Sequence, residues 1–96
     1  MKINVAVILN DLSGNPIKSG ESDLTLREVC VNSLLMNKPN ESVEGTEKLA
    51  RYTLAQRIND SDVAELTVEE LAKIKKLIAE LYTTIVTGAA YAALEG

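Results

Sequence analysis

The sequence predicts an α+β fold that is mostly helical: an N-terminal β-hairpin followed by three helices, the last one long. Three observations lead to this prediction. Residues 2–9 place apolar residues at every second position, which is typical of a strand. Two Ser/Thr-x-x-Glu patterns, at 25–28 and 67–70, are typical of helix starts. From Leu66 to Gly96 the chain contains no proline, and much of it repeats apolar residues at helical spacing.

Length and composition indicate a single domain spanning residues 1–96. A chain of 96 residues can bury roughly 60–65% of its unfolded surface. It has no Trp, no Phe and three Tyr, so its core must be built from aliphatic residues, which suits helix packing. The single Cys30 excludes an intramolecular disulfide. Together with the lack of a signal peptide, it indicates a reducing intracellular compartment. We interpret Cys30 as a small buried hydrophobe.

The N-terminal hairpin is predicted from alternation and turn chemistry. Residues 10–16 are rich in turn formers, and Ile17 and Lys18 can start a short returning strand. Residues 19–23 are polar and are predicted to be a loop. The side of the first strand that should face the core carries Ile3, Val5, Val7 and Leu9.

The next helix is predicted over residues 26–36. Thr25 and Glu28 form its capping box, and Leu24 and Val29 occupy the hydrophobic staple positions. Residues 37–40 should end it. The residues expected to be buried on this helix are Leu26, Val29, Cys30, Ser33 and Leu34.

Another helix is predicted over residues 46–58, and residues 59–62 should end it. Residues 63–66 are expected to be extended and able to pair with the edge of the hairpin. On the helix, the predicted apolar face consists of Leu49, Tyr52, Ala55 and Ile58, with Leu54 beside them.

The last helix starts at the capping box of Thr67 and Glu70. Gly88 leaves two alternatives, because a glycine inside a helix costs about 1 kcal/mol relative to alanine. Either the helix continues through Gly88, or it bends there and residues 89–94 form a separate short helix. The predicted stripe consists of Leu71, Ile74, Ile78, Leu81 and Ile85.

An unbroken last helix of this kind predicts an interface. It would be about 40 Å long, whereas a compact domain of this size is about 30 Å across. Part of the apolar stripe would therefore project and need a cover. We expect a homodimer, because a two-fold contact is the commonest cover; the alternative is that the tail folds back onto its own core. The predicted interface residues are Ile85, Gly88, Ala89, Tyr91, Ala92 and Leu94.

Catalytic, metal and cofactor sites are not expected. The chain has no His, which excludes Cys–His and Ser–His–Asp catalysis and His/Cys zinc sites. Adjacent Glu69 and Glu70 are explained by the helix cap and dipole. Residues 11–15 resemble the start of a calcium loop, but Pro16 and Ser22 stand where that loop needs Gly and Glu. We therefore predict that the protein is not an enzyme.

A protein partner of unknown identity is favoured over nucleic acid or membrane. The net charge of −4 argues against neutralisation of phosphates, and no apolar run reaches the ~20 residues of a membrane span. Residues 66–72 resemble the first helix of a helix-turn-helix, although the short turn and recognition helix that should follow are missing. A small DNA-binding regulator remains the alternative.

The order of these signals resembles a family of small proteins encoded by tailed bacteriophages and prophages. The resemblance is carried by the Asp-Leu-Ser-Gly-Asn-Pro-Ile turn at 11–17, the Leu-Thr-Leu-Arg-Glu-Val helix start at 24–29, the Glu-Leu-Thr-Val-Glu-Glu segment at 65–70 and the Thr-Gly-Ala-Ala-Tyr tail at 87–91. That family has no assigned activity. The resemblance implies a phage-encoded accessory protein that acts in the bacterial cytoplasm or in virion assembly; the function we expect is protein–protein contact, by self-association or by binding a host or phage protein, with a virion structural or assembly component as a further alternative.

Overall fold

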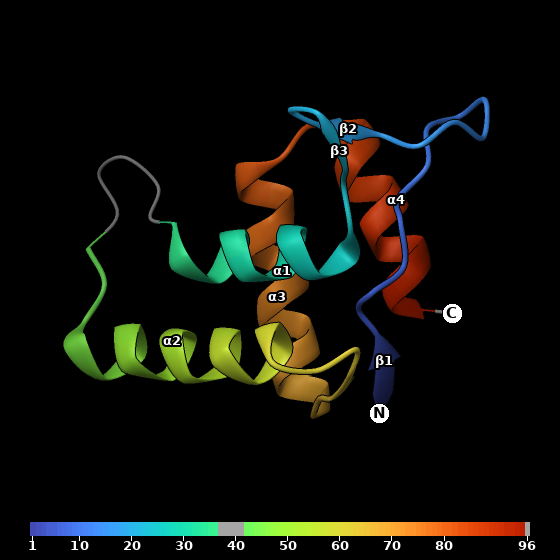
Figure 1. Ribbon diagram of the computed structural model, residues 1–96. Helices are drawn as coiled ribbons and strands as arrows, with labels where there is room; N and C mark the ends of the chain where they lie inside the picture. The colour runs from blue at the N-terminus through green and yellow to red at the C-terminus, as the bar shows by residue number, and fades with distance from the viewer. Residues whose placement is uncertain (37–41, 96) are drawn as a thin grey trace.

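The computed structural model describes residues 1–36 and 42–95 and confirms an α+β, mostly helical fold. The helices form two pairs, α1 with α2 and α3 with α4, and the N-terminal segment passes along α4 (Figure 1). The body measures 40 × 30 × 23 Å. The elements are β1 (Lys2–Asn4), β2 (Lys18–Ser19), β3 (Ser22–Asp23), α1 (Leu26–Leu35), α2 (Gly45–Asn59), β4 (Val63–Glu65), α3 (Val68–Leu81) and α4 (Thr84–Glu95).

The first strand has the predicted alternation but a different partner. Ile3 is buried between exposed Lys2 and Asn4, and the alternation continues to buried Leu9. The strand is interrupted after Asn4, because Asn4 Oδ1 accepts a hydrogen bond from the N–H of Ala6 at 3.0 Å. β1 pairs antiparallel with β4, with Ile3 opposite Ala64. This pairing confirms that the segment before the third predicted helix is extended and joins the N-terminal strand.

The predicted turn at 10–16 forms, but the returning strand does not pair with β1. The carbonyl of Leu9 accepts from the N–H of Ile17 at 2.9 Å, which closes the turn. β2 then pairs with β3, so the prediction of a loop at 19–23 was wrong. Gly20 has a φ of +64°, a conformation that glycine adopts without strain and that allows this tight hairpin.

Helix α1 confirms the predicted start and the predicted buried residues. The hydroxyl of Thr25 accepts from the N–H of Glu28 at 3.2 Å, and the staple residues Leu24 and Val29 are both buried. This is one half of the predicted capping box, since the return bond from the N–H of Thr25 to the Glu28 carboxylate does not form. The helix ends at Leu35, and the predicted end signal at 37–40 lies outside the described residues. The buried residues are Leu26, Val29, Cys30, Ser33 and Leu34, as predicted.

Helix α2 buries a different face from the one predicted. Leu54, Ala55 and Ile58 are buried, whereas Leu49 is 65% exposed and Tyr52 is 53% exposed. The predicted face used a spacing of three, which drifts by about 60° at each step of a helix with 3.6 residues per turn. Leu49 therefore lies about half a turn away from Ile58, on the opposite side of α2.

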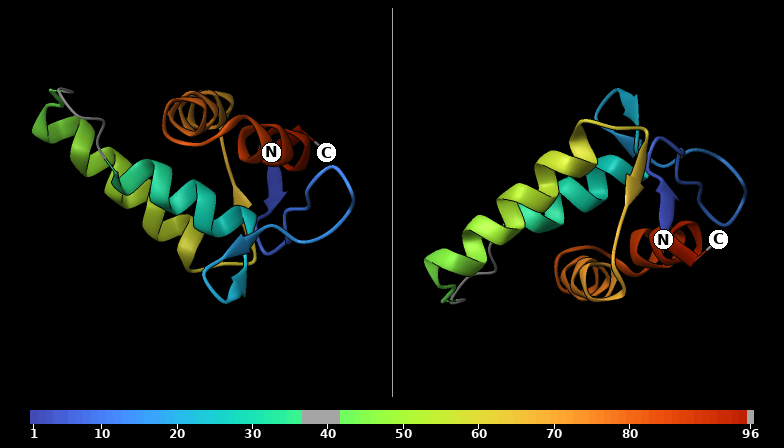
Figure 2. Two further views of the ribbon diagram at one scale, coloured as in Figure 1. Left: turned by 90° about the horizontal axis from the view of Figure 1, so that it is seen from above. Right: turned by 90° about the horizontal axis from the view of Figure 1, so that it is seen from below.

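The long last helix is two helices. α3 ends at Leu81, Tyr82 is extended (φ −116°, ψ 164°), and α4 begins at Thr84. The two helices lie side by side in all three views (Figures 1 and 2). Gly88 lies inside α4, so neither alternative for Gly88 describes the chain: the helix ends at Leu81, before Gly88, and the bend at Gly88 does not occur. The predicted projecting tail was wrong and the alternative that the tail folds back onto its own core is confirmed, because α4 buries its own apolar stripe, Val86, Ala90 and Leu94.

Side-chain contacts between α3 and α4 stabilise the packing of α4 against α3. The hydroxyl of Tyr91 donates to the carbonyl of Lys75 at 2.6 Å. The Lys75 ammonium lies 5.5 Å from the centroid of the Tyr91 ring and pairs with Glu95 at 2.9 Å. These interactions join the middle of α3 to the end of α4 and fix how α4 is presented to the N-terminal segment.

Candidate functional site

The six predicted interface residues separate into two groups. Leu94 is 1% exposed and belongs to the core, and Tyr91 is half-buried against Lys75. Ile85, Gly88 and Ala92 are exposed, and Ala89 is half-buried. The second group lies along the outer side of α4, so this helix presents small apolar side chains to its surroundings.

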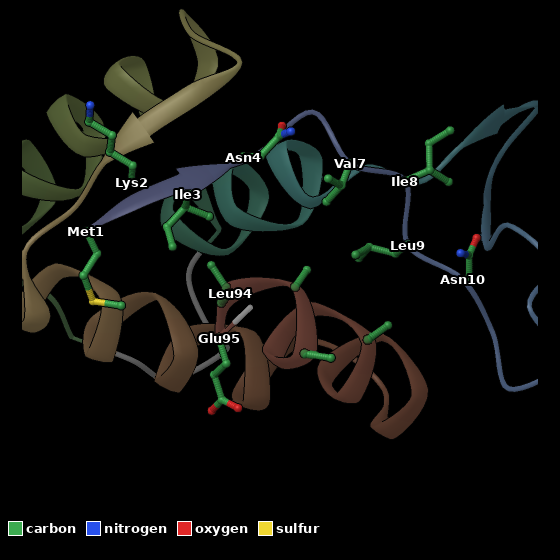
Figure 3. Close-up of a pocket in the computed structure, with 13 residues that line it drawn as sticks. Met1, Lys2, Ile3, Asn4, Val7, Ile8, Leu9, Asn10, Leu94 and Glu95 are labelled. Carbon is green, nitrogen blue, oxygen red and sulfur yellow. The ribbon is translucent and has the colours of Figure 1, made fainter.

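This side of α4 forms one wall of a groove. The groove has a volume of about 730 Å³, within the roughly 300–1,000 Å³ typical of ligand sites. Ala89, Ala92 and Ala93 line it from α4, and residues 1–4 and 7–10 line it from the N-terminal segment. In Figure 3, Ile3 and Leu94 point toward one another at the base of the groove. We call this cleft the apolar groove.

The strand at the rim of the apolar groove has an unpaired edge. The N–H of Leu66 donates to the carbonyl of Met1, and the N–H of Val5 donates to the carbonyl of Asp62. Because backbone groups alternate along a strand, those of Lys2 and Asn4 face away from β4. Within residues 1–36 and 42–95, β1 has β4 as its sole strand partner. An open edge of this kind is a ready template for another chain.

At its other end the apolar groove continues into a projecting turn, at the upper right of Figure 1. Leu12 in this turn is 98% exposed. The turn is nevertheless well held: Asp11 Oδ1 accepts from the N–H groups of Ser13 at 2.9 Å and Asn15 at 3.0 Å. Gly14, with a φ of +85°, allows the chain to reverse there. We call residues 11–15 the Leu12 turn; it holds a large apolar side chain in solvent.

The Leu12 turn also accounts for the calcium-like pattern. The Asp11 carboxylate already accepts two backbone N–H groups of its own turn. Among residues 1–36 and 42–95, no group of three or more acidic, Cys or His side chains is arranged to hold a metal ion.

The two ends of this surface carry opposite charges. Lys2 lies on β1 at the end of the apolar groove, with its side chain extending away from α4 (Figure 3), and Asp11 and Ile85 line the adjoining hollow at the Leu12 turn. Neither side chain forms an ion pair with another described residue. The remaining acidic side chain in the groove lining, Glu95, is paired with Lys75. Lys2 and Asp11 are thus available to charges on another molecule.

The perturbed titratable groups elsewhere are explained by structural contacts. Hydrogen bonds from Lys73 and Arg51 lower the pKa of Glu47, in an ion-pair cluster that joins α2 to α3. Hydrogen bonds from Arg57 and from the N–H of Thr67 lower the pKa of Glu70 at the start of α3. Burial raises the pKa of the Cys30 thiol to about 12, which disfavours the reactive thiolate.

Sequence reasoning identified the α4 side of this surface and missed the other side. Ala89 and Ala92 belong to the interface predicted on the last helix. Residues 10–16 are predicted only as a turn, and Lys2 belongs to no predicted site. The available signal was the position of Leu12 inside a cluster of turn formers. The neighbouring turn residues are small or polar, so they cannot bury a leucine side chain.

Comparison of the chain with protein-family models, curated proteins and solved structures finds no match in any of the three. In the described part of the chain, no helix combines the length and apolar character needed to cross a bilayer. The apolar groove, the open strand edge and the Leu12 turn are the features of this structure that indicate a function.

Proposed function

We propose that this protein is a non-catalytic accessory protein that acts by binding another protein through the apolar groove and the Leu12 turn. The observation that carries the proposal is a continuous surface in which an unpaired strand edge, an alanine-lined helix and a fully exposed leucine lie together. Such features are costly to leave in water and are typical of protein interfaces. The bacteriophage context and the bacterial cytoplasm, which rest on the sequence resemblance, belong to the same proposal.

The arrangement of the cations supports a protein partner over DNA. Helix α4, which follows α3 where a recognition helix would stand, contains no Lys or Arg. Most of the basic side chains elsewhere are engaged by carboxylates, which reduces their availability to phosphates. These paired cations are Lys18, Arg27, Arg51, Arg57, Lys73 and Lys75.

Site-specific photocrosslinking tests the proposal. A photoreactive phenylalanine analogue is placed at Ala92 in the apolar groove and, as the matched control, at Leu49, which is exposed on α2. Bacterial cells producing each variant are irradiated, and the adducts are separated by mass. We expect a defined protein adduct from position 92 and none from position 49. The absence of an adduct at 92, or the same adducts at both positions, would overturn the proposal.

A further inference from the structure

We propose that the occupant of the apolar groove is a second copy of this chain, related by a two-fold axis, with Leu12 of each copy seated against Ala92 and Ala93 of the other. This inference rests on the proposed function, because it names the partner of the same surface. It starts from two features that are unsatisfied in the single chain. One is a hollow whose α4 wall consists of small side chains, and the other is a large side chain held in water.

Shape complementarity connects the two features. A groove must be filled by something convex, and the Leu12 turn is a convex, hydrogen-bonded apolar projection of the same chain. On the groove side, Ala92 is exposed and Ala93 is half-buried, so a short side chain forms the wall where a leucine would enter. Burying one leucine side chain in this way should tighten association about ten-fold or more.

Position along α4 favours a two-fold arrangement. The Leu12 turn lies beside the first turn of α4, near Thr84 and Ile85. The hollow lies beside the last turns, near Ala92 and Ala93. If two copies meet face to face with their α4 helices antiparallel, the projection of each copy faces the hollow of the other. Both contacts form at once and the assembly closes as a dimer.

Charge supports the same register. In this arrangement Asp11 of each copy comes to the end of the groove where the exposed Lys2 of the other copy lies, and the acidic Glu95 at that end is already paired with Lys75. Asp11 and Lys2 are the two charges of the surface that lack an ion-pair partner within the described residues. Opposite charges placed across an interface fix register and disfavour wrong pairings. A parallel arrangement would instead place Asp11 near Asp11 and Lys2 near Lys2.

Sedimentation of the purified protein and two variants tests this inference. Leu12→Ser removes the projection and Ala92→Trp fills the hollow; both positions are exposed, so the fold should persist, as circular dichroism would check. We expect the natural chain to sediment at tens of micromolar as twice its 10.4 kDa mass. Each variant alone should be monomeric. Leu49→Ser, at an exposed leucine on α2, should remain dimeric as the control.

Mixing the variants gives the sharpest result. A pair of Leu12→Ser chains has two hollows and no leucine, and a pair of Ala92→Trp chains has two leucines and no hollow. A mixed pair regains one of the two contacts. We therefore expect a heterodimer that is weaker than the natural dimer and at least ten-fold tighter than either variant with itself, since one leucine contact is worth about 1.4 kcal/mol or more.

The inference would be overturned by a natural chain that is monomeric at tens of micromolar, by variants that dimerise like the natural chain, or by a mixture that associates no more tightly than either variant alone. Assemblies that grow beyond two copies would also contradict the closed two-fold contact. The photocrosslink separates this inference from the proposed function. An adduct at position 92 with a different protein, together with a monomeric purified chain, would contradict the second copy and leave the binding surface supported.

Discussion

Replacing Thr67 by alanine tests how the start of α3 is held. The Thr67 hydroxyl accepts from the N–H of Glu70 at 3.1 Å, and the Glu70 carboxylate accepts from the N–H of Thr67 at 2.9 Å, which completes a capping box. Glu70 also accepts from Arg57 at 2.7 Å. Arg57 in turn donates to the carbonyl of Glu65 at 2.6 Å. The cap therefore joins α3 to both α2 and β4.

The structure sets the size of the expected loss. Thr67→Ala removes the hydroxyl acceptor and leaves the N–H of residue 67 bonded to Glu70, so one of the two capping bonds is lost. Loss of such a side-chain cap costs about 1 kcal/mol. For a domain of this length, that should lower the midpoint of thermal unfolding by about 4–8 °C.

Thermal and urea unfolding, followed by circular dichroism, measure this loss. Thr53→Ala is the matched control, because Thr53 is exposed inside α2 and alanine is the better helix former there. The control should be neutral or slightly stabilising, so the same chemical change should act in opposite directions at the two sites. A Thr67→Ala protein as stable as the natural chain, or a loss of the same size at Thr53, would refute the reasoning.

Three further predictions follow from the packing and the pKa shifts. Arg57 and the N–H of Thr67 lower the folded-state pKa of Glu70 below its usual 4.5. The ionised Glu70 therefore stabilises the fold above about pH 4.5, and this stabilisation is lost as the pH falls through the folded-state pKa. When the free energy of unfolding is measured against pH, Glu70→Gln should reduce its decrease below pH 4.5. Cys30, buried with a pKa raised to about 12, should react with a thiol reagent at pH 8 only as fast as the chain unfolds, and immediate stoichiometric labelling of the native protein would contradict its burial. Leu94→Ala should lower the free energy of unfolding by about 2–5 kcal/mol because Leu94 is a core residue, whereas a loss below 1 kcal/mol in urea unfolding would place it back on the surface.

Local signals predicted the parts of the fold that local contacts determine. The cap at Thr67 and the buried stripe of α1 are set by residues within one or two helical turns, and both are as expected. The face of α2 was misassigned because a spacing of three was followed where the helix needs a mixture of three and four. Glu47 and Arg51 lie on the side of α2 that faces α3. Glu47 forms ion pairs there with Arg51 and with Lys73 of α3, so part of this contact is polar.

The break between α3 and α4 could not be read from the apolar stripe, because the same residues can continue a helix or reverse the chain. The reversal is favoured by contacts across the pair, such as the hydrogen bond from Tyr91 to the carbonyl of Lys75. Thr83 and Thr84, which favour helix termini over helix interiors, were the available local signal. Only the α4 side of the candidate site could be predicted, because the groove depends on contacts between distant parts of the chain. Nothing in the sequence indicates that Lys2 and Ala92 line one groove.

Nuclear magnetic resonance of the natural chain at low and high concentration tests the central claim, that two copies of this chain bind one another through the apolar groove and the Leu12 turn. We expect that raising the concentration shifts the backbone amide signals of residues 2–12 and 84–93, while those around Leu49 on α2 stay unchanged. Shifts centred on α2, or no shifts up to millimolar concentration, would contradict it.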